Sequence, residues 1–385
     1  MIEKALSGDR RYWSWILLLL TVIGAGSFFY LRQLRFGLTI TGLSRDVTWG
    51  FYIAQFTFLV GVAASAVMVV LPYYLHNFKV FGRITILGEF LAIAAVTMCV
   101  LFITVDLGQP ARAFNMMLHP SPRSILFWDM IVLSGYLLLN ATIAQVSLNS
   151  ERKGVPPPSW VKPLVLLSIP WAISIHTVTA FIYSGLAARP FWMTAVLAPR
   201  FLASAFSSGP ALLILLCLIL RRVTRFDAGA EAIRKLAVIV TYAMLANLFF
   251  VLMEFFTAFY SGIPEHVAHF KYLFWGLEGH AELVPWMWSA EILALGALVV
   301  LLRPRLRDRT AWLSAACVSV VVSVWIEKGL GMIVTGFVPS PLGKVTAYVP
   351  TAPELLISLG VYGIGAFLVT TLYKVALSVR GEVAS

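Results

Sequence analysis

Ten apolar runs, each long enough to cross a lipid bilayer as a helix, dominate the 385-residue sequence. A hydrocarbon core of about 30 Å needs roughly 20 helical residues. A helix also satisfies its own backbone hydrogen bonds, as a segment in lipid must. The runs cover residues 13–31, 49–71, 83–105, 125–147, 161–183, 202–220, 236–259, 283–302, 312–334 and 354–377. None shows the weak alternation typical of a membrane β-barrel, so we predict an all-α polytopic membrane protein with about ten transmembrane helices.

The overall composition agrees with a membrane environment. Hydrophobic residues make up 60% of the chain and charged residues only 12%, whereas soluble domains are about 25% charged. This balance excludes a soluble globular enzyme. The formal net charge of +11 comes from Lys and Arg in the loops, where it faces anionic lipid, so it does not indicate a nucleic-acid partner.

The loop charges predict an orientation. Loops on the side shared by both termini carry 19 Lys and Arg residues, against 9 on the other side. Because basic loops stay in the cytoplasm, we expect both termini on the cytoplasmic side of a bacterial or archaeal cytoplasmic membrane. The first run follows Lys4, Arg10 and Arg11 but is too long for a signal peptide, so we interpret it as a retained span.

The loops on the other, outer side are long and rich in Pro, Gly, aromatic and ionisable residues. They comprise residues 106–124, 185–201, 262–282 and 336–353. Plain connectors tend to be short. Two interpretations therefore stay open, a docking surface for a partner protein and an outer cap that packs on itself.

Several ionisable side chains fall within the predicted spans, where a charge at mid-bilayer costs about 2.5–3.5 kcal/mol. They are Glu89, Asp129, His176, Glu254, Glu291, Glu327 and Lys328, with Asp106 at a helix end. All except Glu89 are expected in the outer half of the membrane. Each has a structural explanation, such as the helix dipole for Asp129 or simple ion pairing for Glu327 and Lys328. It is therefore the cluster that indicates function.

Most redox and metal chemistries lack ligands in this sequence. The three cysteines lie in separate spans without a CxxC motif, which excludes an iron–sulfur cluster held by this chain alone. Only His176 of the six histidines lies clearly inside a span, so we do not expect haem. The outer histidines His266, His269 and His280 match no zinc spacing, and we predict no metal site.

The remaining pattern is a pocket with a few ionisable groups and aromatic walls, including Trp49, Trp128, Trp171 and Tyr183. Such a pocket suits a flat, lipophilic quinone, whose ring needs apolar walls and whose carbonyls need polar partners. A His or carboxylate there can move the protons of quinone reduction. The alternatives are an ion or small-molecule transporter, whose matching broken helices are not evident, and a structural membrane anchor.

Five segments of the sequence together resemble those of a known family of membrane proteins. They are Thr48–Tyr52 (TWGFY), Thr104–Arg112 (TVDLGQPAR), Ile169–His176 (IPWAISIH), Glu254 and Tyr348–Ser358 (YVPTAPELLIS). In these segments the chain resembles the NrfD/PsrC family of quinone-interacting membrane subunits, in its ten-helix, HybB-like branch. Residues 43–140 look closest to the DsrP branch, which is linked to dissimilatory sulfur metabolism in DsrMKJOP complexes.

The resemblance implies a single membrane domain over residues 1–385. It would hold two four-helix bundles at about 49–183 and 202–334, with flanking helices at 13–31 and 354–377. It also implies the quinone-reactive subunit of a larger oxidoreductase, not an enzyme alone. The expected partners are a periplasmic, ferredoxin-like iron–sulfur subunit and further membrane and cytochrome subunits. The expected quinone is menaquinone rather than ubiquinone, with no haem or iron–sulfur cluster in this chain.

Carried over by position, the resemblance implies four quinone-pocket residues, namely Asp106, Arg112, His176 and Glu254. Depth in the membrane and chemistry add Trp49 and Tyr183 to this pocket. Glu89 and Glu291 are expected on a proton path, with Glu89 toward the cytoplasm. No residue is expected to be catalytic without a partner subunit.

Overall fold

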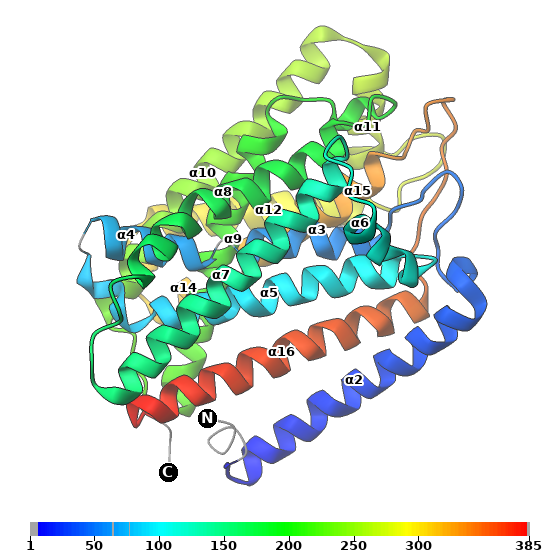
Figure 1. Ribbon diagram of the computed structural model, residues 1–385. Helices are drawn as coiled ribbons and strands as arrows, with labels where there is room; N and C mark the ends of the chain where they lie inside the picture. The colour runs from blue at the N-terminus through cyan, green and yellow to red at the C-terminus, as the bar shows by residue number, and fades with distance from the viewer. Residues whose placement is uncertain (1–6, 64, 77, 383–385) are drawn as a thin grey trace.

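The computed structural model describes residues 7–63, 65–76 and 78–382. Within these residues the chain is helical, and the only β pairing is an isolated bridge between Leu277 and His280. Ten helical segments of the described chain are long and apolar enough to cross a membrane. The predicted all-α, ten-span architecture is therefore confirmed (Figure 1).

The first five spans hold about half of the chain. They are α2 (Arg10–Phe36) with η1 (Gly37–Ile40), α3 (Phe51–Ala63) with α4 (Ser65–Leu75), α5 (Thr85–Asp106), α7 (Ile125–Lys153) and α8 (Val161–Ser184). Short helical turns connect them, namely η2 (Lys79–Arg83), η3 (Pro110–Phe114) and α6 (Asn115–Leu118).

The second five spans follow the turn η4 (Pro190–Trp192). They are α9 (Leu197–Val223), α10 (Ala230–Ser261), α12 (Val284–Leu302), the run α14–η5–α15 (Thr310–Val324, Trp325–Gly331, Met332–Thr335) and α16 (Ala352–Arg380). The segment η5 is π-helical. This geometry is rare in proteins as a whole, but where it occurs it is often at a functional site. Between spans lie α11 (Pro264–Phe274) and α13 (Pro304–Arg307). The expected outer loop 262–282 thus contains a helix, because Pro264 at its first turn favours helix initiation.

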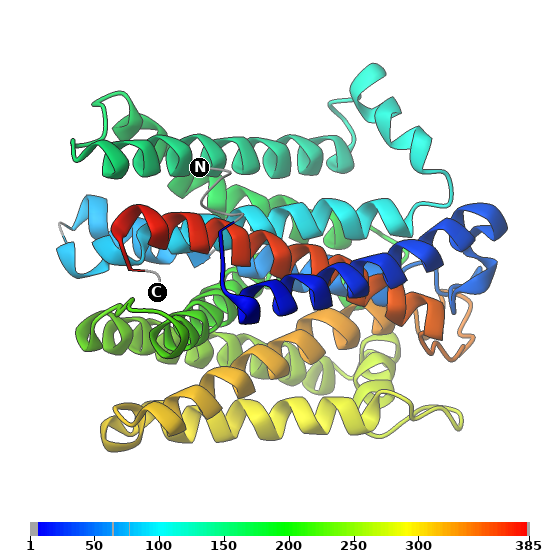
Figure 2. The same ribbon diagram turned by 90° about the horizontal axis from the view of Figure 1, so that it is seen from below.

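The helices form an elongated stack in which α3 is central and α2 is peripheral (Figures 1 and 2). In the apolar stretch of the span formed by α3 and α4, 94% of the residues are buried, against 17% for α2. The helix α3 packs against α5, α9 and η5, while α2 packs along α16, which in turn packs on α5. Polar and ionisable side chains, which are costly to expose to lipid, are therefore best accommodated around α3.

The first turn of α2 and the last turn of α16 lie toward the same end of the stack (Figure 1). At the opposite end, α16 begins with a capping box in which Thr351 and Glu354 bond each other's backbone. The Glu354 carboxylate also accepts hydrogen bonds from Gly42 N and the Tyr348 hydroxyl, both at 2.7 Å. This buried carboxylate therefore links the loop that contains Gly42 and the loop that contains Tyr348 to the start of α16.

A glycine contact brings α2 and α16 together. A Cβ atom added to Gly26 would lie 2.6 Å from Gly360 Cα, so any side chain there must separate the two helices. Small residues at such crossings are common between membrane helices because they let backbones pack closely. The Trp15 indole, which donates to the Thr370 hydroxyl at 3.1 Å, adds a second link.

We expect Gly26→Val to destabilise the protein by about 1–3 kcal/mol, the usual cost of overpacking. Gly24→Val is the matched control, because a Cβ at Gly24 meets no atom within 4 Å. Thermal unfolding in detergent measures both variants. Equal melting temperatures for the two would contradict the close α2–α16 contact.

Candidate functional site

One face of α8 presents a stripe of polar side chains to the protein interior. His176, Thr179 and Tyr183 follow at i, i+3 and i+7, a spacing that places them on one face of a helix. Each is at most 1% exposed. We call these three residues the α8 stripe.

Two members of the α8 stripe have side-chain partners on neighbouring helices. Thr179 Oγ1 donates to Asp129 Oδ1 of α7 at 2.8 Å. The Tyr183 hydroxyl lies 2.5 Å from Thr57 Oγ1 of α3. Asp129, predicted as a buried acid near a helix N-terminus, is therefore held by a hydroxyl.

The third member of the stripe, His176, is different. It is fully buried, and neither Nδ1 nor Nε2 has a hydrogen-bond partner among the residues that the structure describes. Buried polar groups are almost always hydrogen-bonded, so an exception calls for an explanation.

Lys328 of η5 is the charged group that acts electrostatically on this imidazole. Its Nζ lies 3.5 Å from the Phe201 carbonyl oxygen and 4.2 Å from the centre of the Phe201 ring. Within residues 7–63, 65–76 and 78–382, no carboxylate forms an ion pair with Lys328. A Cβ at Gly61 would lie 3.3 Å from Nζ, so this glycine makes room for the ammonium group.

Aromatic rings cap the α8 stripe at its outer end. The Trp49 ring lies 5.8 Å from the Tyr183 ring and stacks on Trp192 at 6.0 Å. Trp192 is fully buried, and its ring centre lies 5.2 Å from that of Phe337. Its indole N–H donates to the Met332 carbonyl oxygen at 2.9 Å. Sequence reasoning missed Trp192 and Phe337 because both lie outside the apolar runs. The predicted pair Trp49 and Tyr183 does come together.

A separate ionic network lies between α9, α10 and η5. Arg200 donates to both Glu254 and Glu327, and Asn247 Nδ2 donates to Glu327 Oε2 at 3.2 Å. Arg200 was expected in the outer loop 185–201 and instead lies within α9, because two carboxylates neutralise its charge there. Glu254 therefore belongs to this network and not to the α8 stripe. Of the two residues expected to pair with others as structural ions, Glu327 pairs with Arg200, whereas Lys328 forms no ion pair among the described residues.

Asp106 and Arg112 lie at the outer end of α5 and just beyond it. Asp106 is half-buried, and its Oδ1 has no partner in the described part of the chain. Asp106 is the last residue of α5, and Tyr183 lies one residue before the end of α8, so both lie toward the outer ends of their helices. Arg112 is exposed on η3 and forms no ion pair with Asp106.

Glu89 stands apart from all of these groups. It is 2% exposed on α5, about 26 Å of helix away from Asp106. Its Oε2 has no hydrogen-bond partner among the described residues. Glu89 therefore belongs to the half of the protein near the chain ends.

The outer histidines do not assemble a metal site. His269 is buried, and its Nδ1 lies 3.0 Å from the Val338 carbonyl. Burial lowers the pKa of His269 to about 4, so the ring is neutral at physiological pH. His280 pairs with Glu282 at 3.1 Å. In the part of the chain that the structure covers, no three His, Cys, Asp or Glu side chains are placed to hold a metal ion.

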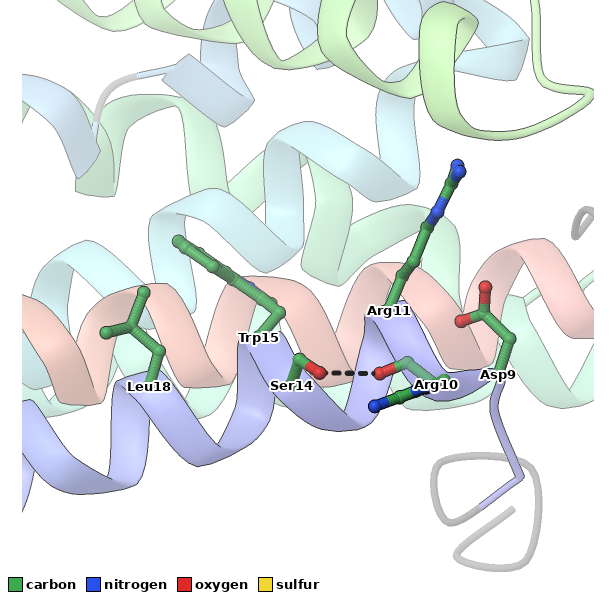
Figure 3. Close-up of a pocket in the computed structure, with 6 residues that line it drawn as sticks. All are labelled: Asp9, Arg10, Arg11, Ser14, Trp15 and Leu18. Atoms are coloured by element: carbon green, nitrogen blue, oxygen red, sulfur yellow. Dashed lines mark hydrogen bonds between the residues drawn. The ribbon is translucent and has the colours of Figure 1, made fainter.

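Two hollows differ greatly in position. The larger, about 740 Å³, is an open groove on the first turns of α2, the peripheral helix of the stack (Figure 3). Its lining residues are Asp9, Arg10, Arg11, Ser14, Trp15 and Leu18. The smaller, about 20 Å³, is interior and lies beside Glu291 and Glu327.

Ten apolar spans around buried ionisable side chains define a multi-pass integral membrane protein with a polar interior. Residues 39–338 match the family described as Polysulphide reductase, NrfD, and the chain belongs to this family. The predicted family is thus confirmed.

Three relatives are named as membrane subunits of different oxidoreductases. The chain is 27% identical to a putative dimethyl sulfoxide reductase membrane subunit from Halobacterium salinarum, over 93% of this chain and 89% of the relative. It is 24% identical to an Hdr-like menaquinol oxidoreductase integral membrane subunit from Archaeoglobus fulgidus, over 84% and 80%. It is 21% identical to a menaquinone reductase integral membrane subunit from Nitratidesulfovibrio vulgaris, over 94% and 91%.

We expect Arg200→Gln to cost about 3–5 kcal/mol of unfolding free energy, because it leaves two buried carboxylates without their cation. Arg234→Gln is the control, since Arg234 pairs with Asp308 at an exposed position, where such pairs contribute about 0–1 kcal/mol. Denaturant unfolding in mixed micelles measures both. An Arg200 variant as stable as the control would show that this network does not hold the spans together.

Proposed function

We propose that this chain is the quinone-interacting membrane subunit of an oxidoreductase complex, with its quinone pocket next to His176. Membership in the NrfD family supports the proposal. So do the names of two relatives, a menaquinol oxidoreductase subunit and a menaquinone reductase subunit. For this chain, menaquinone is accordingly proposed ahead of ubiquinone.

The observation that carries the proposal is the imidazole of His176, which is buried and has no hydrogen-bond partner among the described residues. Leaving a buried polar group unpaired costs about 1–3 kcal/mol. A quinone carbonyl is a hydrogen-bond acceptor and satisfies an imidazole N–H, while the surrounding apolar side chains suit its ring. The ammonium of Lys328, which among the described residues contacts the Phe201 carbonyl and ring, is a second donor for the same ligand.

Proton transfer fits the same side chains. Reduction of a quinone to a quinol takes two electrons and two protons, one proton at each carbonyl oxygen. His176 is proposed as a donor and acceptor of one of these protons, because imidazole titrates near neutral pH in water. Asp106, Trp49 and Tyr183 are proposed at the outer entrance to the pocket. Arg112, which is exposed, and Glu254, which is paired with Arg200, are placed outside it.

The outer face is proposed as the docking side for the redox partner. We propose that this face is periplasmic, that both termini are cytoplasmic, and that an iron–sulfur, ferredoxin-like subunit binds there. Further membrane and cytochrome subunits, and a role in dissimilatory sulfur metabolism of the DsrP type, remain predictions from the family resemblance. Glu89 remains a proposed member of a proton path toward the cytoplasmic side.

We expect His176→Ala to lower quinol-linked turnover by roughly 100-fold or more, the usual contribution of a positioned acid–base group. The complex should assemble normally, because no side chain in the described structure is bonded to His176. Turnover with a menaquinol analogue and the menaquinone content of the purified complex are the two measurements.

Thr177→Ala is the matched control for that experiment. Thr177 is the next residue on α8, and its hydroxyl bonds only to the Ile173 carbonyl of its own helix. Unchanged turnover in His176→Ala would remove this residue from the site. A purified complex without any quinone would favour the structural-anchor alternative.

A further inference from the structure

The second half of the chain encloses a small polar cavity between α10, α12, α14 and η5. Its volume is about 20 Å³, which is enough for one water molecule. Four polar residues line it, namely Asn247, Glu291, Ser323 and Glu327, and the rest of the wall is apolar. A water inside would therefore meet the two to four polar partners that a buried water needs.

Asn247 leaves an acceptor available in this cavity. The side chain is 5% exposed, and its Nδ2 donates to Glu327 Oε2 at 3.2 Å. This bond fixes the orientation of the amide, because only the NH₂ end can donate to a carboxylate. The amide Oδ1 has no donor among the described residues. A buried acceptor of this kind needs a donor from a guest molecule.

The charges around the cavity do not balance. Three carboxyl groups, those of Glu254, Glu291 and Glu327, stand beside two cations, Arg200 and Lys328. Arg200 is ion-paired with Glu254 and Glu327, and the charge of Lys328 interacts with Glu327. One negative charge therefore has no counterion when all three carboxyls are ionised.

Glu291 is the carboxyl without a specific partner. The described residues offer it no ion pair and no hydrogen bond, and the charges that face it are Glu327 of η5 and Arg200 of α9. The helix α14 has no charged side chain. The charged or titratable groups of α11 and α13, none of which pairs with Glu291, are Glu265, His266, His269, Lys271, Tyr272, Arg305 and Arg307. A lone carboxylate in hydrocarbon is so costly that it becomes neutral instead.

We propose that Glu291 holds one exchangeable proton within the membrane, and that a single water in the cavity links it to Asn247 Oδ1 and Glu327. The protonated carboxyl donates to the water oxygen. The water donates one hydrogen to the Asn247 carbonyl oxygen and the other to the Glu327 carboxylate. One proton makes the set of three carboxyls and two cations neutral and gives the acceptor of Asn247 its donor.

The segment η5 couples the proton on Glu291 to the α8 stripe. Glu327 and Lys328 are consecutive, yet Glu327 bonds Arg200, whereas Lys328 contacts Phe201, whose ring centre lies 5.9 Å from that of Tyr183 in the α8 stripe. Loss of the proton from Glu291 adds a negative charge next to Glu327 and thereby stabilises the ammonium form of Lys328. This coupling rests on the proposed quinone function, whereas the proton site itself does not.

Infrared difference spectroscopy on the full complex tests the proton site without any quinone. We expect the spectrum of wild type minus Glu291→Gln at neutral pH to show the carbonyl band of one protonated carboxylic acid. The band should shift in D₂O, because the proton is exchangeable. Glu265→Gln, a change at an exposed position of α11, is the control and should remove only an ionised carboxylate band. Loss of only ionised carboxylate bands in Glu291→Gln would overturn the proposal.

Asn247→Leu tests the linking water and does not depend on the Glu291 variant assembling. The larger apolar side chain occupies the cavity and removes the acceptor, so the carboxylic band should persist at a higher wavenumber, as for a weaker hydrogen bond. An unmoved band would overturn the water link. His176→Ala should leave the band unchanged, so a failure of the quinone pocket and a failure of this site give different results.

Discussion

Placing a charge inside a membrane costs free energy, and the structure depends on how that cost is offset. The offset is most complete at Arg200. Its guanidinium bonds Glu254 of α10 and Glu327 of η5, so one side chain of α9 ties three spans together. The next residue on α9, Phe201, supplies the carbonyl and ring that hold Lys328, and Lys328 follows Glu327 directly. The ionic network of the second half therefore sets the position of the ammonium group that interacts electrostatically with His176 in the first half. Removing a partner from such a buried set is far more damaging than breaking an exposed pair.

The fold was predictable because span length is a local property of the sequence. Each of the ten runs meets the roughly 20-residue requirement of the bilayer by itself, and the helices differ from the predicted runs mainly at their ends. Arg200 shows where this reasoning stops. A charged residue next to an outer loop is assigned to the loop by hydropathy, while its partners lie 54 and 127 residues away in the sequence. Long-range pairing of this kind leaves no local pattern.

The difference between local and long-range signals in the sequence also explains which residues of the candidate site were predictable. A lone imidazole in an apolar run is conspicuous, so His176 was found from the sequence, and its spacing to Tyr183 on α8 is a helical property. Trp192 and Phe337 are as deeply placed as Tyr183, but they come from the outer segments 185–201 and 336–353, where aromatic residues give no periodic signal. Arg112 illustrates the opposite case. It lies six residues beyond Asp106, yet η3 turns it outward, because nearness in sequence does not fix direction after a helix ends.

Several side-chain atoms without a described hydrogen-bond partner flank η5, while others, among them atoms of Glu89, Asp106 and Glu382, lie elsewhere. Gln55 accepts from Trp325 of η5 and from Tyr362, both at 2.7 Å, but its Nε2 is left without an acceptor. His176 lacks partners on the side of Lys328, and Asn247 Oδ1 lacks one on the side of Glu327. Packing alone selects against such groups, because each costs free energy that an apolar side chain would not. Local exceptions to polar satisfaction are expected at functional sites. Here several of them flank the one π-helical turn of the described spans, where consecutive residues face two different polar centres.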